Sequence, residues 1–225
     1  MLHISDMAQA RSTTKKVSNR REKLQGLYAI TDEKLTPDDV VALKVEEALI
    51  SGVKIIQYRN KSKNDDEVEL TCKALQTLCT KYGALFIIDD RPHLAQKIGV
   101  DGLHVGKDDM PLSQARAIFT KGIIGVSCYG SIKKAKEAES EGADYVAFGS
   151  FFASPTKPHS GIVSMSVLQK AKEQLSIPVC AIGGIDSTNI DLIAQQNPDM
   201  ISCVSSVFDG NITQNILMLE KGMRR

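Results

Sequence analysis

Between Leu85 and Val105 the chain reads LFIIDDRPHLAQKIGVDGLHV. The runs Leu85 to Asp89 and Gly102 to Val105 are typical of short buried strands, and Pro92 to Ile98 between them has the apolar spacing of an amphipathic helix. Gly99 supplies a stop signal for that helix. This stretch therefore predicts two strands joined by a helix, and such a unit forms a parallel sheet with a right-handed crossover.

The same alternation continues in both directions along the chain. The predicted strands are Leu27 to Thr31, Lys54 to Arg59, Leu85 to Asp89, Gly102 to Val105, Ile123 to Ser127, Tyr145 to Gly149, Val179 to Gly183 and Met200 to Ser205. The predicted helices are Asp38 to Ser51, Asp65 to Lys81, Pro92 to Ile98, Leu112 to Phe119, Ser131 to Glu141, Ser164 to Leu175, Ser187 to Gln196 and Ile212 to Gly222. Eight units of this kind are enough to close a barrel.

Strict alternation is compatible with an open doubly wound sheet or with a closed barrel. An open dinucleotide-binding sheet usually carries GxGxxG after its first strand, whereas this first strand runs into Thr31-Asp32-Glu33-Lys34. We therefore predict an α/β fold with a single (β/α)8 TIM barrel over residues 25–225. A short basic N-terminal extension, residues 1–24, would precede it and be either disordered or a short helix.

The charge is balanced overall but uneven along the chain. The 225 residues include 28 basic and 27 acidic side chains, a net charge of +1. Residues 1–24 contain six basic and two acidic side chains, which leaves 22 basic and 25 acidic ones in the body. A chain so balanced has no global field for gripping nucleic acid or an anionic membrane, so we expect neither as a partner.

Cysteine spacing and hydropathy favour a cytoplasmic protein. Five cysteines are spread widely without a CxxC pair, which argues against a disulfide framework and a structural zinc site and favours small buried apolar groups. No run approaches 18 consecutive apolar residues, and the N-terminus lacks an apolar signal core. A transit peptide in the basic extension is the weaker alternative.

Polar residues follow the predicted strands at the end where the active sites of such barrels lie. Gln57 and Arg59 are two residues apart on a strand and share a face, and Lys61 lies just beyond them. A guanidinium and an ammonium together suit a diphosphate, and Ser127 and Lys157 would converge on the same mouth. The alternative is an ordinary surface charge run after a strand.

Two carboxylates lie on successive strand exits. Asp90 and Asp109 would be close enough in a barrel to share a hard cation, and magnesium typically takes one or two protein carboxylates and completes its shell with water and phosphate oxygens. Both could instead be helix caps, because Asp109 shortly precedes Pro111 and a predicted helix.

A second anionic subsite is predicted after the last two strands. Gly183-Gly184 and Ser205 stand where phosphate sites often form in these barrels, although a glycine pair is also common in a plain tight turn. His104, on the fourth strand, could be a structural group or an acid or base. Two anionic subsites in one mouth suggest that two phosphorylated molecules are joined.

The order and spacing of these motifs resemble the thiamine-phosphate synthase family from about Gly26 to Val207. The motifs are GLYAITD at 26–32, QYRNK at 57–61, IDDR at 88–91, DGLHVGKDD at 101–109, IGVS at 124–127, GADYVAFG at 142–149, SPTK at 154–157, AIGGI at 181–185 and VSS at 204–206. The resemblance implies a transferase that joins hydroxymethylpyrimidine diphosphate to a thiazole phosphate, releasing pyrophosphate and giving thiamine monophosphate. A carboxylated thiazole would also lose CO2. The implied reaction depends on Mg2+ and passes through a pyrimidine carbocation.

The resemblance also implies a role for each matching residue. Catalysis would fall to Arg59, Lys61, Ser127 and Lys157. The pyrimidine diphosphate would be bound by Gln57, Tyr58, Arg59, Asn60, Lys61, Asp89, Ser127 and Lys157. The thiazole phosphate would be bound by Ser154, Pro155, Thr156, Gly184, Val204 and Ser205. Asp90 and Asp109 would hold Mg2+.

Three residues depart from the commonest family pattern: Asp89 stands for Asn, Lys107 for Gln and Ser154 for Thr. The carboxylate of Asp89 would repel a diphosphate unless it were protonated, metal-bound or turned away. Two other functions stay open, a related thiazole tautomerase that does not need the diphosphate and metal residues, and a non-catalytic sensor of thiazole phosphate whose basic extension contacts a partner. Assembly into a homo-oligomer also stays open.

Overall fold

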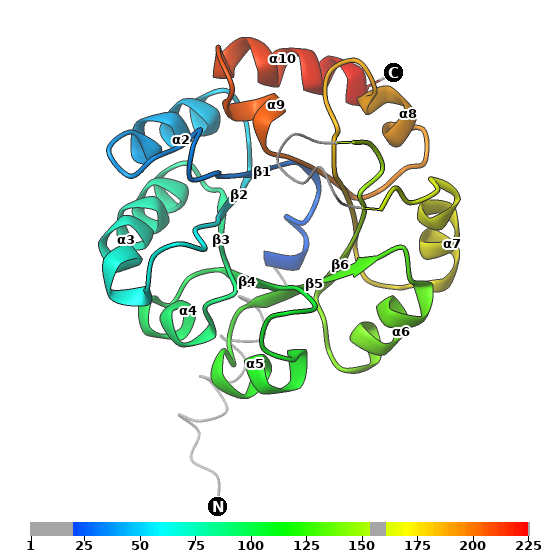
Figure 1. Cartoon of the computed structure of the whole chain (residues 1–225), viewed down its shortest axis with the longest axis horizontal. Coiled ribbons are helices and arrows are strands. Elements are labelled where there is room, and N and C mark those ends of the chain that lie inside the picture. The colour runs from blue at the N-terminus through cyan, green and yellow to red at the C-terminus, as the bar shows by residue number, and fades with distance from the viewer. Residues whose placement is uncertain (1–19, 154–160, 225) are drawn as a thin grey trace, which may run out of the picture.

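Eight parallel strands form a closed barrel in the computed structural model, which describes residues 20–153 and 161–224 (Figure 1). The strands pair in chain order and the last pairs with the first. They are β1 Gly26–Ile30, β2 Ile55–Tyr58, β3 Leu85–Asp89, β4 Gly102–Val105, β5 Ile123–Tyr129, β6 Tyr145–Phe148, β7 Val179–Ile182 and β8 Met200–Cys203. The predicted (β/α)8 barrel is therefore confirmed, and every strand end lies within two residues of its predicted position.

Helices surround the barrel as an outer ring (Figure 1). They are α2 Val41–Ile50, α3 Asp65–Lys81, α4 Pro92–Ile98, α5 Leu112–Ile118, α6 Ile132–Ser140, α7 Ser166–Gln174, α8 Ile190–Ala194, α9 Ser205–Phe208 and α10 Ile212–Met223. One difference from the sequence prediction bears on the site. Ser205 was expected to end the eighth strand, but it begins the one-turn helix α9 instead.

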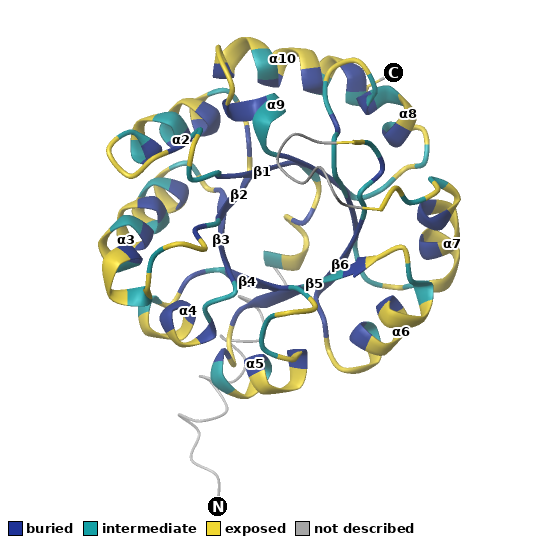
Figure 2. Cartoon of the chain, viewed as in Figure 1, coloured by how far each residue is buried: buried dark blue, intermediate teal, exposed yellow. Residues whose placement is uncertain are grey.

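Alternate residues of each strand face the barrel interior or the helices, as the period of a strand requires. The interior cluster contains Tyr28, Ile30, Leu85, Ile87 and Tyr145. A larger cluster fills the layer between strands and helices, so the buried faces in Figure 2 line the inner side of the helix ring. None of the helices in the described ranges is long and apolar enough to cross a membrane.

Residues 20–24 cover the end of the barrel opposite the strand exits. Arg21 binds Asp144, whose side chain is 1% exposed at the start of β6, and Arg20 binds Asp101 just before β4. Leu24 is 2% exposed and packs with the interior cluster. Buried charges need partners, so the contact of Arg21 with Asp144 ties this segment to the barrel. The packed body thus begins before residue 25.

Candidate functional site

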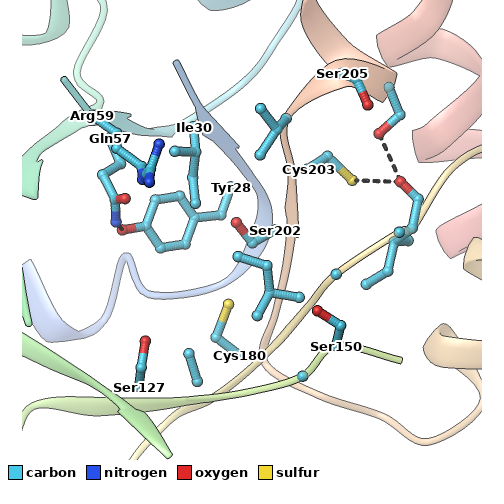
Figure 3. A pocket seen from close by; sticks show the side chains of 18 of the residues that line it. Tyr28, Ile30, Gln57, Arg59, Ser127, Ser150, Cys180, Ser202, Cys203 and Ser205 are labelled. Atoms are coloured by element: carbon cyan, nitrogen blue, oxygen red, sulfur yellow. Dashed lines mark hydrogen bonds between the residues drawn. The ribbon is translucent and has the colours of Figure 1, made fainter. Parts of the chain in front are cut away.

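A cavity of about 850 Å³ opens at the carboxyl ends of the strands. Every strand contributes to its wall, and the side chains labelled in Figure 3 surround one shared space. Tyr28 and Gln57 lie at one side of it and Ser205 at another. Active sites of (β/α)8 barrels lie at this end, so the cavity is the candidate active site.

The β2 exit brings a cation to the cavity. Arg59 lines it beside Gln57, as the shared strand face predicted, and the Arg59 amide donates to Thr31 Oγ1 at 3.0 Å. Arg59 Nε lies 3.7 Å from Asp89 Oδ2. The Arg59 backbone is thus held by the end of β1, and its guanidinium is held by the end of β3.

The ammonium of Lys61 forms ion pairs with three carboxylates. Its Nζ atom lies 3.0 Å from Asp89 Oδ2, 3.2 Å from Asp90 Oδ2 and 3.4 Å from Asp109 Oδ1. These contacts explain how the unusual Asp89 is accommodated, because Lys61 and Arg59 both offset its negative charge. Asp90 and Asp109 lie close together, as their positions on successive strand exits predicted, and both contact the Lys61 ammonium.

Asp90 and Asp109 are two close carboxyl groups whose pKa values are shifted in opposite directions. Burial, followed by the hydrogen bond with Asp109, raises the pKa of Asp90. Burial also acts to raise the pKa of Asp109, but hydrogen bonds from Asp90 and from the Gly106 amide outweigh it and hold that pKa below its ordinary value. One proton shared between two close carboxylates is typical of groups that cannot both ionise without a cation.

The geometry of both aspartates favours a ligand role over helix capping. Asp109 Oδ2 accepts from the Gly106 amide at 2.7 Å, and neither α4 nor α5 has a side-chain N-cap. The Asp90 backbone has φ of +55°, a left-handed conformation that is costly outside glycine and is often found at functional sites. Hard oxygen donors in this number fit magnesium that keeps water and phosphate in its remaining positions. Within the described ranges, no group of three or more Asp, Glu, His or Cys side chains is arranged so that it could hold one metal ion.

Arg91 fastens the loop that carries Lys61. Its guanidinium donates to the carbonyls of Asn60 and Lys63 and pairs with Asp65 at the start of α3. The Arg91 side chain is 12% exposed, so these charge-assisted bonds are partly shielded from water. No role for Arg91 was predicted from the sequence, because only the path of the loop reveals one.

The structure does not bring Tyr58 or Asn60 into the cavity, although both were expected to bind the pyrimidine diphosphate. Tyr58 is 3% exposed and packs in the layer between strands and helices, because it alternates with the inward-facing Gln57. Asn60 uses its side chain to accept from the Lys63 amide. Both line a separate, smaller hollow beside α2.

A buried hydrogen-bonded chain crosses the floor of the cavity. Gln57 Nε2 donates to Tyr28 Oη at 2.6 Å, which lies 2.9 Å from Tyr145 Oη. His104 then lies with Nδ1 2.8 Å from Tyr145 Oη and Nε2 2.8 Å from Ser127 Oγ. Neither tyrosine was predicted to belong to the site, although both occupy inward-facing strand positions, as Gln57 and Ser127 do.

The opposite side of the mouth has close backbone packing. Gly184 has φ of +66°, and a Cβ atom there would stand 2.5 Å from the carbonyl oxygen of Ala153. Gly184, Val204 and Ser205 all line the cavity, as expected for the thiazole phosphate. Ser154, Pro155, Thr156 and Lys157 lie outside the described residues.

Ser202 and Lys107 also line the cavity, and neither was among the residues predicted to bind substrate. The buried hydroxyl of Ser202 has no hydrogen-bond partner among the described residues. Lys107 is one of the three departures from the family pattern. Burial raises the pKa of the Cys180 thiol, which is consistent with the predicted role of the cysteines as inert buried groups.

Comparisons with known proteins agree with this geometry. A family described as thiamine monophosphate synthase matches residues 27–207. The thiamine-phosphate synthase of Wolinella succinogenes is 44% identical over 194 residues, which cover 85% of this chain and 89% of that protein. The one from Acidithiobacillus ferrooxidans is 46% identical, covering 82% of this chain and 87% of the relative. The solved thiamine phosphate pyrophosphorylase of Pyrococcus furiosus superposes with a TM-score of 0.82 at 37% identity, covering 91% and 97% of the two chains.

Proposed function

Because the chain belongs to the thiamine monophosphate synthase family, we propose that it is a magnesium-dependent transferase that joins hydroxymethylpyrimidine diphosphate to a thiazole phosphate. The products are thiamine monophosphate and pyrophosphate, with CO2 in addition when the thiazole is carboxylated. The observation that carries the proposal is the cluster of Lys61 with Asp89, Asp90 and Asp109 beside Arg59 at the edge of the cavity. A tautomerase acting on thiazole phosphate alone has no use for this cluster.

Asp90 and Asp109 are the residues that would hold Mg2+. An ion held there would offset negative charge on the diphosphate and on the departing pyrophosphate. Because Asp90 and Asp109 are only two carboxylates, phosphate oxygens would be needed as further ligands, and metal binding would depend on substrate binding. Lys61 is close enough to both carboxylates to turn from them to an arriving diphosphate.

The chain's own residues stabilise the leaving group. Arg59, Lys61, Ser127 and Lys157 would surround the diphosphate with fixed positive charge and a hydroxyl donor, which favours the charge that develops as the C–O bond breaks. The electron-rich aminopyrimidine carries the positive charge left on its methylene carbon. The thiazole nitrogen then forms the new C–N bond to that carbon.

The cavity supplies positioning and protection from water. Ile30, Ala147 and Ile182 give it apolar walls that limit capture of a carbocation by solvent. Ser154, Thr156, Gly184, Val204 and Ser205 would hold the thiazole phosphate on the side of β7 and β8. Most of the rate enhancement would then come from orientation and electrostatics, with little acid–base chemistry.

A single substitution separates the two subsites. Asp90→Ala should abolish turnover and magnesium-dependent binding of pyrophosphate, measured by calorimetry, while binding of thiazole phosphate persists. Asp66→Ala, an exposed aspartate on α3, is the matched control and should change neither. Loss of both ligands by a folded Asp90→Ala protein would contradict separate subsites.

A further inference from the structure

A continuous line of five polar side chains from five different strands runs beneath the cavity. In order they are Gln57, Tyr28, Tyr145, His104 and Ser127, with neighbouring atoms 2.6 to 2.9 Å apart. Gln57, Tyr28 and Tyr145 are at most 2% exposed and His104 is 9% exposed. Only the two ends of the line, Gln57 and Ser127, were given a role in binding substrate.

The direction of this line follows from counting protons. Burial raises the pKa of both Tyr28 and Tyr145 well above the ordinary value, so each phenol keeps its single proton. Gln57 Nε2 donates to Tyr28, which leaves the Tyr28 proton to be donated to Tyr145. The Tyr145 proton is then donated to His104 Nδ1.

The far end of the line is fixed by the same count. An imidazole that accepts at Nδ1 carries its proton at Nε2, and Nε2–H donates to Ser127 Oγ. Ser127 Oγ therefore accepts a hydrogen bond from His104, and the Ser127 O–H is left to donate to a group in the cavity that Ser127 lines. If every hydrogen bond in the line had the opposite direction, Ser127 would donate its only hydroxyl proton to His104 and could not donate to substrate.

We infer that Tyr145 is a positioning residue that donates its proton to His104, so that His104 is held as the Nε2–H tautomer and Ser127 presents its proton to the diphosphate. The inference rests on the proposed function for the identity of that acceptor. Tyr145 does not line the cavity, so it acts on substrate only through His104 and Ser127. A hydrogen bond from Ser127 to a phosphoryl oxygen gains strength as the departing pyrophosphate gains charge.

The Tyr145 ring is held by close packing. A Cβ atom on Gly125 would stand 1.9 Å from the Tyr145 ring, so only glycine at that position of β5 leaves room for it. The Tyr28 ring meets the Tyr145 ring edge-on, with centroids 6.2 Å apart. A hydroxyl on so constrained a ring costs little further entropy to orient, which is what a positioning group requires.

The direction of the line can be measured on the free protein. Nitrogen-15 NMR of the histidine side chains should show His104 as the Nε2–H tautomer at neutral pH, with the signal assigned by its loss in His104→Gln. Tyr28→Phe should leave this tautomer in place, because Tyr145 keeps its proton and its bond to Nδ1. Tyr145→Phe removes that bond and should raise the Nδ1–H fraction. An Nδ1–H tautomer in the unsubstituted protein would overturn the inference, even if Tyr145→Phe failed to fold.

Kinetics then test the link to Ser127. Losing the support of one buried hydrogen bond should lower kcat/KM for the pyrimidine diphosphate about five- to tenfold in Tyr145→Phe. In a Ser127→Ala background the same substitution should change kcat/KM less than about twofold, because no hydroxyl remains to be oriented. Tyr82→Phe, which removes a hydroxyl bonded to Glu46 outside the barrel, is the matched control and should leave kcat/KM unchanged.

The two measurements keep the inference separate from the proposed function. An equal loss in both backgrounds would mean that Tyr145 acts on stability alone and would overturn the positioning role. If the protein failed to join the two heterocycles, the proposed function would fall, while the NMR experiment would still decide the direction of the line and the effect of Tyr145 on His104.

Discussion

Lys61 Nζ lies 3.2 Å from Asp90 Oδ2. The lysine that is proposed to bind the diphosphate therefore forms an ion pair with an aspartate that is proposed to bind magnesium. Lys61 and a metal ion should therefore compete for the same carboxylates until a diphosphate draws the lysine away. Removing a unit charge at such a distance should tighten Mn2+ or Mg2+ binding to the free protein about tenfold in Lys61→Met, while turnover is lost.

Calorimetry with Mn2+ and no substrate checks this prediction. Lys63→Met is a suitable control, because the Lys63 ammonium pairs with Asp38 outside the carboxylate cluster and its loss should not change metal affinity. Weaker metal binding in Lys61→Met would show that the lysine supports the metal site and does not compete with it.

Asp90 and Asp109 should have opposite effects on stability at neutral pH. The pKa of Asp90 is raised in the folded state, mainly by burial and then by Asp109, so ionising it as pH rises costs stability. The pKa of Asp109 is lowered, so its ionised form stabilises the fold at neutral pH and that stability is lost as pH falls. Asp90→Asn should therefore raise the Tm of the metal-free protein at pH 7, and Asp109→Asn should lower it.

Thermal unfolding in the presence of a chelator measures both effects. For Asp90→Asn the gap in Tm from the unsubstituted protein should close as pH falls towards about 4, the ordinary carboxyl pKa. For Asp109→Asn the gap should begin to close only near about pH 4 and should vanish below the lowered pKa of the folded state. Asparagine tolerates the left-handed backbone at position 90, so strain should not obscure the comparison. Changes of the same sign in the two variants would contradict the assigned pKa directions.

Arg91 should affect catalysis indirectly, because its hydrogen bonds fix the loop that carries Lys61. Lysine cannot donate to two carbonyls and a carboxylate in the fork geometry of arginine, so Arg91→Lys should loosen the segment that carries Lys61. Losing one charge-assisted bond predicts a fall of about tenfold or more in kcat/KM for the pyrimidine diphosphate. Binding of thiazole phosphate should not change.

Arg116 provides a matched control at the other end of the barrel. Its guanidinium donates hydrogen bonds to the main-chain carbonyls of Gly122 and Gly142 and pairs with the buried carboxylate of Asp144. Arg116→Lys should lower the Tm without a selective loss of kcat/KM for the pyrimidine diphosphate. Equal kinetic losses in the two variants would mean that Arg91 contributes only to general stability.

Much of the fold could be predicted because each unit repeats a simple pattern. The strand Leu85–Asp89 and the helix Pro92–Ile98 have the predicted bounds, since apolar runs and a glycine stop define them locally. The helix Ser205–Phe208 was missed because four residues are too few to show a helical period. The close grouping of Asp90 with Lys61 could also be expected, because both follow neighbouring strands.

The remaining parts of the site depend on contacts that a linear pattern does not contain. The role of Arg91 follows from the path of a loop, and the line from Tyr28 to His104 joins strands far apart in sequence. Strand alternation could have placed Tyr58 outside the cavity, because Gln57 and Arg59 already occupied the inward face. For residues 57–61, the family motif therefore identified the segment that binds substrate, and strand geometry identified which of its side chains face the cavity.

The most direct test of the proposed function is the coupling reaction itself. Purified protein with Mg2+, hydroxymethylpyrimidine diphosphate and thiazole phosphate should form thiamine monophosphate and pyrophosphate in equal amounts, as measured by chromatography and a phosphate-release assay. A chelator, or Asp90→Ala, should stop the formation of both products. Folded protein that forms neither product with both substrates and magnesium present would contradict the proposed function.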